Sequence, residues 1–108
     1  MSHVINVVGT RPAPGDEERF HHWYAEHIRT VMQHPGVVGA TRYRNLGRDA
    51  DRLPFLCIYK FRSAEDFRDY NAGPILKQSE EERRHFWNGP GFDVQLREQF
   101  EPIASFTR

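Results

Sequence analysis

The segment Phe55–Phe61 limits the possible folds more than any other part of the sequence. It has the pattern of a β-strand whose side chains alternate between Phe55, Cys57, Tyr59, Phe61 on one side and Leu56, Ile58, Lys60 on the other. Because both sides are largely apolar, we expect this strand to be covered on both faces of its sheet. A chain of 108 residues supports one core, so residues 1–108 are expected to form a single domain. A small sheet can cover its second face by pairing with another copy, which predicts a two-fold homodimer.

Proline and glycine positions divide the rest of the chain into elements. Apolar, β-branched runs predict further strands at 4–8, 37–45 and 92–100. A first helix is expected over 16–33, with Asp16 as its cap and with His34-Pro35-Gly36 ending it. A second helix, capped by Ser63, is expected to reach Tyr70, break, and resume from Pro74 to Trp87. Loops or turns are expected at 10–15, 47–52 and 88–91 and an extended tail at 102–108.

The resulting order of elements is β-α-β-β-α-β. This order is typical of the α+β, ferredoxin-like fold, in which a four-stranded antiparallel sheet carries its helices on one face. The strands at 37–45 and 55–61 are close enough in sequence to form a hairpin.

Composition excludes several classes of function. Fifteen basic and fifteen acidic residues leave no net charge, which argues against a nucleic acid as the main partner. No apolar run approaches the roughly 20 residues needed to span a bilayer. The start of the chain lacks the pattern of a signal peptide, and the lone Cys57 allows no internal disulfide. We therefore expect a cytoplasmic protein that binds neither membranes nor nucleic acid.

The first predicted helix contains the most informative position. At 100° per residue, an arc of about 60° holds Phe20, Tyr24, His27 and Val31. His27 therefore lies in the stripe that must face the sheet. One explanation is a core histidine that bonds a neighbouring tyrosine or carbonyl. The other is a small-molecule pocket, because polar side chains are expected to converge there from Tyr24, Asn6, Tyr43, Cys57 and Tyr59.

The segment Phe20-His21-His22-Trp23-Tyr24-Ala25-Glu26-His27 supports the second explanation. Together with His34-Pro35-Gly36-Val37-Val38 and Ala40-Thr41-Arg42-Tyr43, it resembles the EthD-like branch of the dimeric α/β-barrel superfamily. The resemblance implies that two sheets pair into a barrel and that each subunit holds a pocket between its sheet and its helices. Relatives include lactone isomerases, cyclases and cofactor-free oxygenases of aromatic polyketides. In the isomerases and cyclases a helical histidine and a nearby tyrosine act on the substrate, and His27 and Tyr24 match that pattern.

These observations predict a small enzyme that needs no cofactor. We expect it to act by proton transfer (isomerisation, cyclisation or dehydration) on a hydrophobic, aromatic or cyclic oxygenated metabolite, as in secondary metabolism or aromatic degradation. The expected roles are general acid or base for His27, with a pKa near the working pH, and orientation or charge stabilisation for Tyr24 and Tyr43. The other expected substrate-binding residues are Trp23, Tyr59, Trp87 and Asn6. The alternatives are a non-catalytic binder of small hydrophobic ligands, a cofactor-free oxygenase of aromatic substrates, and a structural dimer with a closed pocket.

Other polar groups have simpler explanations. His21, His22 and His27 do not share a helix face at the spacing that zinc sites use, so no metal site is expected. No second histidine is placed as an axial ligand, so haem is not expected either. Cys57 lies in an apolar strand and is expected to be a packed thiol. The charged residues 80–84 are most simply a solvated helix face, although Glu82 or Arg83 can alternatively reach into a pocket and orient an anionic substrate.

Overall fold

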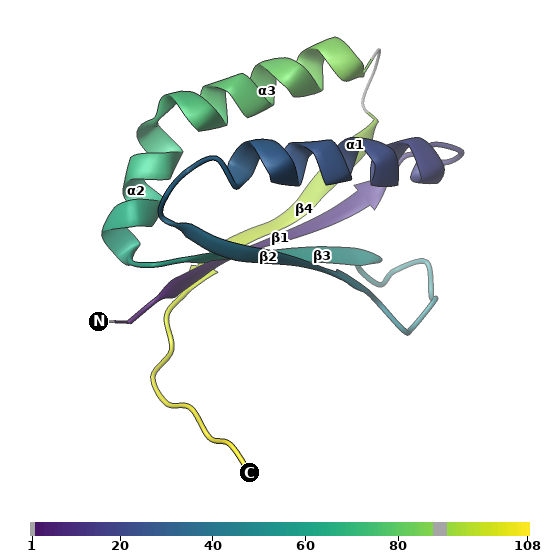
Figure 1. Ribbon diagram of the computed structural model, residues 1–108. Helices are drawn as coiled ribbons and strands as arrows, with labels where there is room; N and C mark the ends of the chain where they lie inside the picture. The colour runs from purple at the N-terminus through teal and green to yellow at the C-terminus, as the bar shows by residue number, and fades with distance from the viewer. Residues whose placement is uncertain (1, 88–90) are drawn as a thin grey trace.

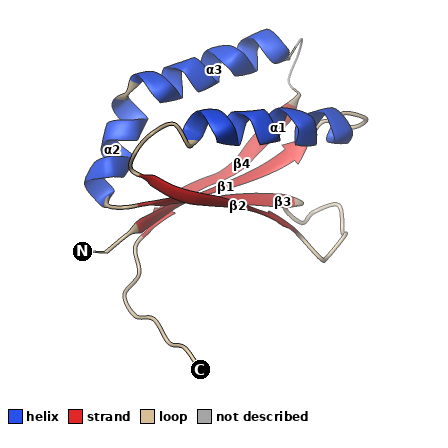
Figure 2. Cartoon of the chain, viewed as in Figure 1, coloured by secondary structure: helices blue, strands red, loops and turns tan. Residues whose placement is uncertain are grey.

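The computed structural model describes residues 2–87 and 91–108, which form four strands and three helices. In chain order these are β1 (Val4–Pro12), α1 (Glu17–Val31), β2 (Val37–Arg44), β3 (Phe55–Phe61), α2 (Ala64–Ala72), α3 (Pro74–Phe86) and β4 (Phe92–Phe100). Figure 1 shows α1 and the α2–α3 pair lying over the same face of the sheet. The opposite face carries no helix (Figure 2).

The sheet has the strand order β2-β3-β1-β4, and all neighbouring strands are antiparallel. The two central strands, β1 and β3, were both expected from apolar runs. β2 and β3 form the predicted hairpin, and β3 has the predicted bounds. The ferredoxin-like α+β fold is therefore confirmed, with the second helix divided in two.

Two features near the first loop differ from the sequence prediction. β1 continues to Pro12 instead of ending at Val8, because residues 10–12 pair with β4. β3 pairs with β1 only as far as Thr10, so Pro12 lies where the strand has a single neighbour and tolerates the missing N–H. The cap expected at Asp16 is also wrong, since its side chain makes no capping hydrogen bond to α1.

The second helix begins and divides as predicted. The Ser63 hydroxyl accepts a hydrogen bond from the Asp66 N–H at 3.1 Å, which satisfies a free donor at the start of α2. The helix breaks at Gly73, and Pro74 begins α3, where a missing N–H costs nothing. The turn predicted at 88–91 lies mostly outside the described residues. Gly91 has φ of +62°, a left-handed conformation that favours glycine.

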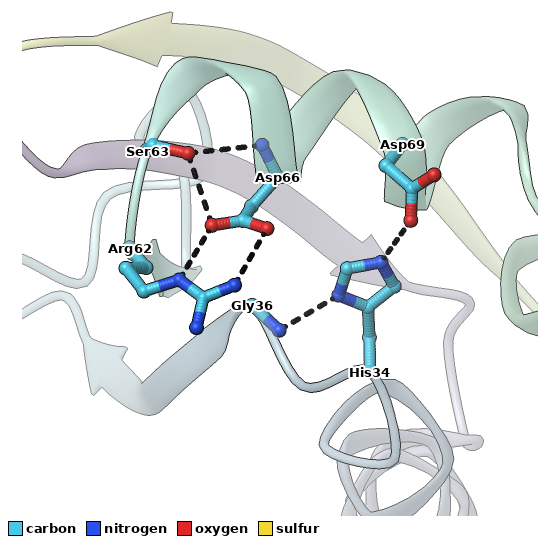
Figure 3. A network of polar contacts seen from close by, with 6 residues as sticks. All are labelled: His34, Gly36, Arg62, Ser63, Asp66 and Asp69. Carbon is cyan, nitrogen blue, oxygen red and sulfur yellow. Dashed lines mark hydrogen bonds and ion pairs between the residues drawn. The ribbon is translucent and has the colours of Figure 1, made fainter.

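Side-chain hydrogen bonds fasten the end of α1 to α2 (Figure 3). The buried His34 ring bonds the Asp69 carboxylate through Nε2 at 2.7 Å and accepts the Gly36 N–H at Nδ1. Because Nδ1 accepts, Nε2 is the nitrogen that carries hydrogen and donates to Asp69. Asp66 also holds the Arg62 guanidinium. These contacts fix the turn between α1 and β2 against the helix layer.

The core lies between the sheet and the helices. Its most buried side chains are Phe20, Val31, Cys57 and Phe61. The other face of the sheet is partly apolar, with half-buried Leu56 and Ile58 and an exposed Phe100. The C-terminal tail extends away from the helices on this bare side (Figure 1), and its Ile103 is 98% exposed.

None of the described helices is long and apolar enough to cross a bilayer. The cytoplasmic location expected from the sequence stays a prediction.

Candidate functional site

A cavity of about 500 Å³ lies between the sheet and the helix layer. From the sheet it is lined by residues that include Asn6, Val8, Thr10, Tyr59, Arg97 and Gln99. From the helices it is lined by residues that include Trp23, Tyr24, His27, Tyr70, Ser79 and Arg83. This volume is in the range of small-molecule binding sites.

The cavity brings His27 together with aromatic rings of its own helix. The Trp23 ring stacks on the His27 ring at a centroid distance of 4.7 Å, and the Tyr24 ring meets it edge-on at 5.4 Å. These contacts follow from helical geometry, because residues three and four apart lie on one face. The prediction that His27 faces the sheet beside a cavity is confirmed.

A second helix holds the other side of the imidazole. Ser79 is buried on α3, and its Oγ lies 2.8 Å from His27 Nδ1. This bond leaves Nε2 as the ring nitrogen available to a ligand. The two helices are also joined by Thr30, whose hydroxyl donates to Glu82 at 2.9 Å. The position of the imidazole is therefore set by stacking within α1 and by a bond from α3.

The surroundings of His27 favour its neutral form. Burial lowers its pKa from the ordinary 6.5 to about 4. This lowered value includes smaller contributions from nearby charges: Glu82 raises the pKa, and Arg83 and Arg97 lower it. The expected pKa near the working pH is therefore wrong. At neutral pH the imidazole can accept a proton or a hydrogen bond, but it has no extra proton to give.

Two tyrosines and the cysteine meet beneath α1. The Tyr59 hydroxyl donates to the Tyr24 hydroxyl over 3.4 Å. Burial raises the pKa of both phenols, so both keep their protons and can donate a hydrogen bond to a ligand oxygen. Burial also raises the pKa of Cys57, which is 1% exposed. The structure agrees with the expectation that Cys57 is a packed thiol.

The sheet contributes a polar pair to the cavity. Gln99 on β4 donates to Asn6 Oδ1 on β1 at 2.9 Å, across a direct pairing of the two strands. Asn6 is buried, as expected for a polar residue that interrupts an apolar strand.

Tyr43 and Trp87 are not among the residues that line the cavity. Tyr43 is 49% exposed and pairs with Leu56 on the opposite face of the sheet. The cause is a register shift between Val37 and Gly39, which reverses the alternation after the buried Val37 and turns Arg42 toward the helices instead. Trp87 is buried in the core, with its ring 6.4 Å from that of Trp23. It therefore supports the wall behind the cavity.

Sequence reasoning missed Ser79 and Arg97 as site residues. The signal for Ser79 was present, because a small polar residue interrupts the apolar stripe of α3. The signal for Arg97 was hidden by a second irregularity. Opposite Gly9 and Thr10 of β1, strand β4 carries one extra residue, so Val94 and Arg97 point to the same face.

The described residues, 2–87 and 91–108, contain no cluster of three or more His, Cys, Asp or Glu side chains placed to hold a metal ion.

Comparison with known proteins shows the fold. No family model matches the chain, and no curated protein sequence matches it. Among solved structures, a hydroxynitrile lyase from Passiflora edulis superposes with a TM-score of 0.72 at 14% identity, over 97% of both chains. The cofactor-independent oxygenase SnoaB from Streptomyces nogalater gives 0.56 at 19% identity, over 98% of this chain and 94% of its own. A dimeric ferredoxin-like protein of unknown function from Jannaschia sp. CCS1 gives 0.64 at 17% identity, over 93% and 99%.

These similarities support the ferredoxin-like fold of dimeric proteins. At this level of identity the roles of residues in those proteins are not assigned to residues of this chain. The assignment to the EthD-like branch stays a prediction.

Proposed function

We propose that this protein is a small enzyme in which His27 removes a proton from a hydrophobic, oxygenated substrate bound in the cavity. The observation that carries the proposal is an imidazole that faces the cavity and is held by Trp23 and Ser79. A core histidine that only fills space needs no cavity beside it.

The proton transfer follows from the geometry around His27. When Nδ1 carries the hydrogen and donates it to Ser79 Oγ, the lone pair of Nε2 is free to take a proton from the substrate. Proton loss next to a carbonyl leaves negative charge on the carbonyl oxygen. The Tyr24 or Tyr59 hydroxyl, kept protonated by burial, can donate a hydrogen bond to that oxygen. If His27 returns the proton to another atom of the substrate, the reaction is an isomerisation. If the proton instead passes to a hydroxide that leaves the substrate as water, the reaction is a dehydration.

The cavity walls favour an aromatic or cyclic substrate. Trp23, Tyr59 and Tyr70 supply flat aromatic surfaces, and the polar groups among them can bind the oxygen atoms of such a substrate. A hydroxynitrile lyase and a cofactor-independent oxygenase have similar folds, which agrees with an enzyme. The oxygenase also supports a second candidate, in which the deprotonated substrate reacts with molecular oxygen.

A non-catalytic ligand-binding protein is the third candidate. The lowered pKa of His27 favours it, because an imidazole with a pKa of about 4 is a weak base. Such a protein would use the same cavity and would not depend on proton transfer.

We also propose that two copies pair through their bare sheet faces. Leu56 and Ile58 of β3 are only half-buried in one subunit, and Phe100 of β4 is exposed. Two structures of similar fold are described as dimeric ferredoxin-like proteins. Pairing would cover the second apolar face of β3, which the helices leave bare, as the sequence pattern requires.

Turnover by a His27 variant tests the enzyme proposal. A thermal-shift screen with aromatic and lactone metabolites first identifies ligands, and those that the protein converts serve as substrates. His27→Gln keeps the size and one hydrogen bond of the side chain but cannot transfer a proton. We expect it to lower kcat by about 10²- to 10⁴-fold with the fold intact. His22→Gln, an exposed change on the same helix, is the matched control. Wild-type turnover by His27→Gln would show that the histidine is not the base.

A further inference from the structure

Two arginines enter the cavity from opposite sides. Arg83 comes from α3, and its guanidinium lies over the Phe92 ring at 4.1 Å from the ring centre. Arg97 comes from β4 opposite Val8, on the face that lines the cavity. The extra residue in β4 is what turns Arg97 inward, since without it the alternation from Val94 would point Arg97 to the bare face. The structure thus places positive charge on both the helix and the sheet side of one cavity.

The carboxylates nearest to Arg83, Asp93 and Glu80, form no ion pair with it in the described structure. Among the described residues, neither Arg83 nor Arg97 forms an ion pair. Glu80 is the one acidic residue that lines the described cavity, and it lies exposed on α3. Glu82 is engaged by the hydroxyl of Thr30 and the amide of Gln78.

The surroundings of Arg83 favour an anionic ligand beside it. Burial, followed by the neighbouring charge of Arg97, lowers the pKa of Arg83. The one side-chain hydrogen bond of Arg83 in the described structure is a long contact of 3.4 Å to the Phe92 carbonyl. A guanidinium with several free donors beside a second cation is suited to a planar anion.

We propose that the substrate is an aromatic or cyclic carboxylic acid whose carboxylate is held between Arg83 and Arg97 while its ring system lies against Trp23 and Tyr59. The inference rests on the proposed function only for the proton transfer at His27. Binding itself needs the cavity and the two arginines alone. The planar guanidinium forks match a carboxylate, and the aromatic walls match the ring that carries it.

Binding of such an anion would also strengthen His27 as a base. Its carboxylate would offset the charges of Arg83 and Arg97, which lower the pKa of His27 in the empty cavity. Of the other titratable groups on the packed elements, Glu82 raises this pKa, and the protonated Tyr24 and Tyr59 carry no charge at neutral pH. The substrate would therefore raise the proton affinity of the group that acts on it.

A pair of matched probes tests the proposal. 2-Naphthoate and the uncharged 2-naphthamide have the same ring and nearly the same shape, and calorimetry at pH 7 measures the affinity of each. We expect the wild-type protein to bind the carboxylate at least about tenfold more tightly than the amide, as for a charged hydrogen-bonding pair. Arg97→Gln and Arg83→Gln should each remove most of this preference and leave amide binding unchanged. Arg84→Gln, an exposed change of the same charge on α3, is the control and should change neither affinity.

Several results would overturn the proposal. Equal binding of the two probes would do so, as would no binding of 2-naphthoate up to millimolar concentration. An equal loss of affinity for both probes in the arginine variants would also overturn it, because that result indicates that the arginines act by packing and not by charge. If Arg83→Gln does not fold, the exposed Arg97→Gln still decides the matter. The variant His27→Gln separates the two proposals. If it still binds 2-naphthoate more tightly than 2-naphthamide, the arginine site is supported. If it also has wild-type turnover, the catalytic role of His27 is contradicted.

Discussion

At the scale of single residues, the account depends on which face a side chain occupies. Helical spacing alone predicted that His27 faces the sheet, because a 15-residue helix repeats its inward face regularly. Tyr43 was expected at the cavity because its strand lies where this helix can cover it, and this was wrong because one register shift in β2 reverses the alternation. Sequence reasoning also missed Arg97, for the same reason in β4. Such irregularities depend on the neighbouring strand, so the sequence of one strand does not contain them.

The half-buried His27 predicts a specific loss of stability in acid. Its pKa is about 4 in the folded protein and near 6.5 in the unfolded chain. Above pH 6.5 the ring is neutral in both states, and as the pH falls toward 4 the unfolded state binds a proton that the folded state does not. At pH 5 this costs the folded protein about 2 kcal/mol.

Urea denaturation at pH 7 and pH 5 measures this effect. The free energy of unfolding should fall less between these pH values in His27→Gln than in the wild type, by about 2 kcal/mol. His22→Gln should behave like the wild type. An identical pH dependence in all three proteins would mean that the folded state does not disfavour the charged His27 ring.

At the scale of elements, local signals predicted best. The bounds of β3, the cap at Ser63 and the break before Pro74 depend on neighbouring residues and were all predicted. The end of β1 was not, because its last residues are extended only through their pairing with β4, about 80 residues further along the chain. The contact of α3 with α1, which completes the site through Ser79, is also a long-range event.

Ser79 is predicted to be a positioning residue for His27. Ser79→Ala removes the bond that orients the imidazole, which is worth about 1 kcal/mol. We expect kcat to fall about threefold to tenfold, while KM changes little because the cavity keeps its shape. Steady-state kinetics of Ser79→Ala measure this, with the exposed Lys77→Ala as control. A rise in KM at constant kcat would indicate that Ser79 contacts the substrate instead.

At the scale of the whole molecule, the fold leaves one face of its sheet to be covered. A monomer would keep the apolar side of Leu56 and Ile58 partly in contact with water. The C-terminal tail beyond β4 extends on the same bare side (Figure 1), and its Ile103 and Phe106 are exposed. The apolar pattern of β3 thus predicts a second copy, although it contains no information on the chemistry of the cavity.

Light scattering tests the pairing. The protein should have twice its chain mass of 12.7 kDa at micromolar concentration. Ile58→Glu places a charge in the proposed interface and should give a folded monomer, because burying an unpaired charge costs several kcal/mol. Lys60→Glu changes a polar position of the same strand, and this variant should dimerise more strongly than Ile58→Glu. A wild-type protein with a mass of 12.7 kDa at these concentrations would contradict the pairing.

The central claim is that His27 is a neutral, half-buried imidazole available to a ligand, and its own titration tests this most directly. Nuclear magnetic resonance of histidine-labelled protein follows each ring as the pH changes, and the His27→Gln spectrum identifies the signal of residue 27. We predict that this ring titrates near pH 4 in the empty protein, as its burial requires. Titration near 6.5, as in an unfolded chain, would mean that the ring is solvated, and it would contradict the site on which the proposed function depends.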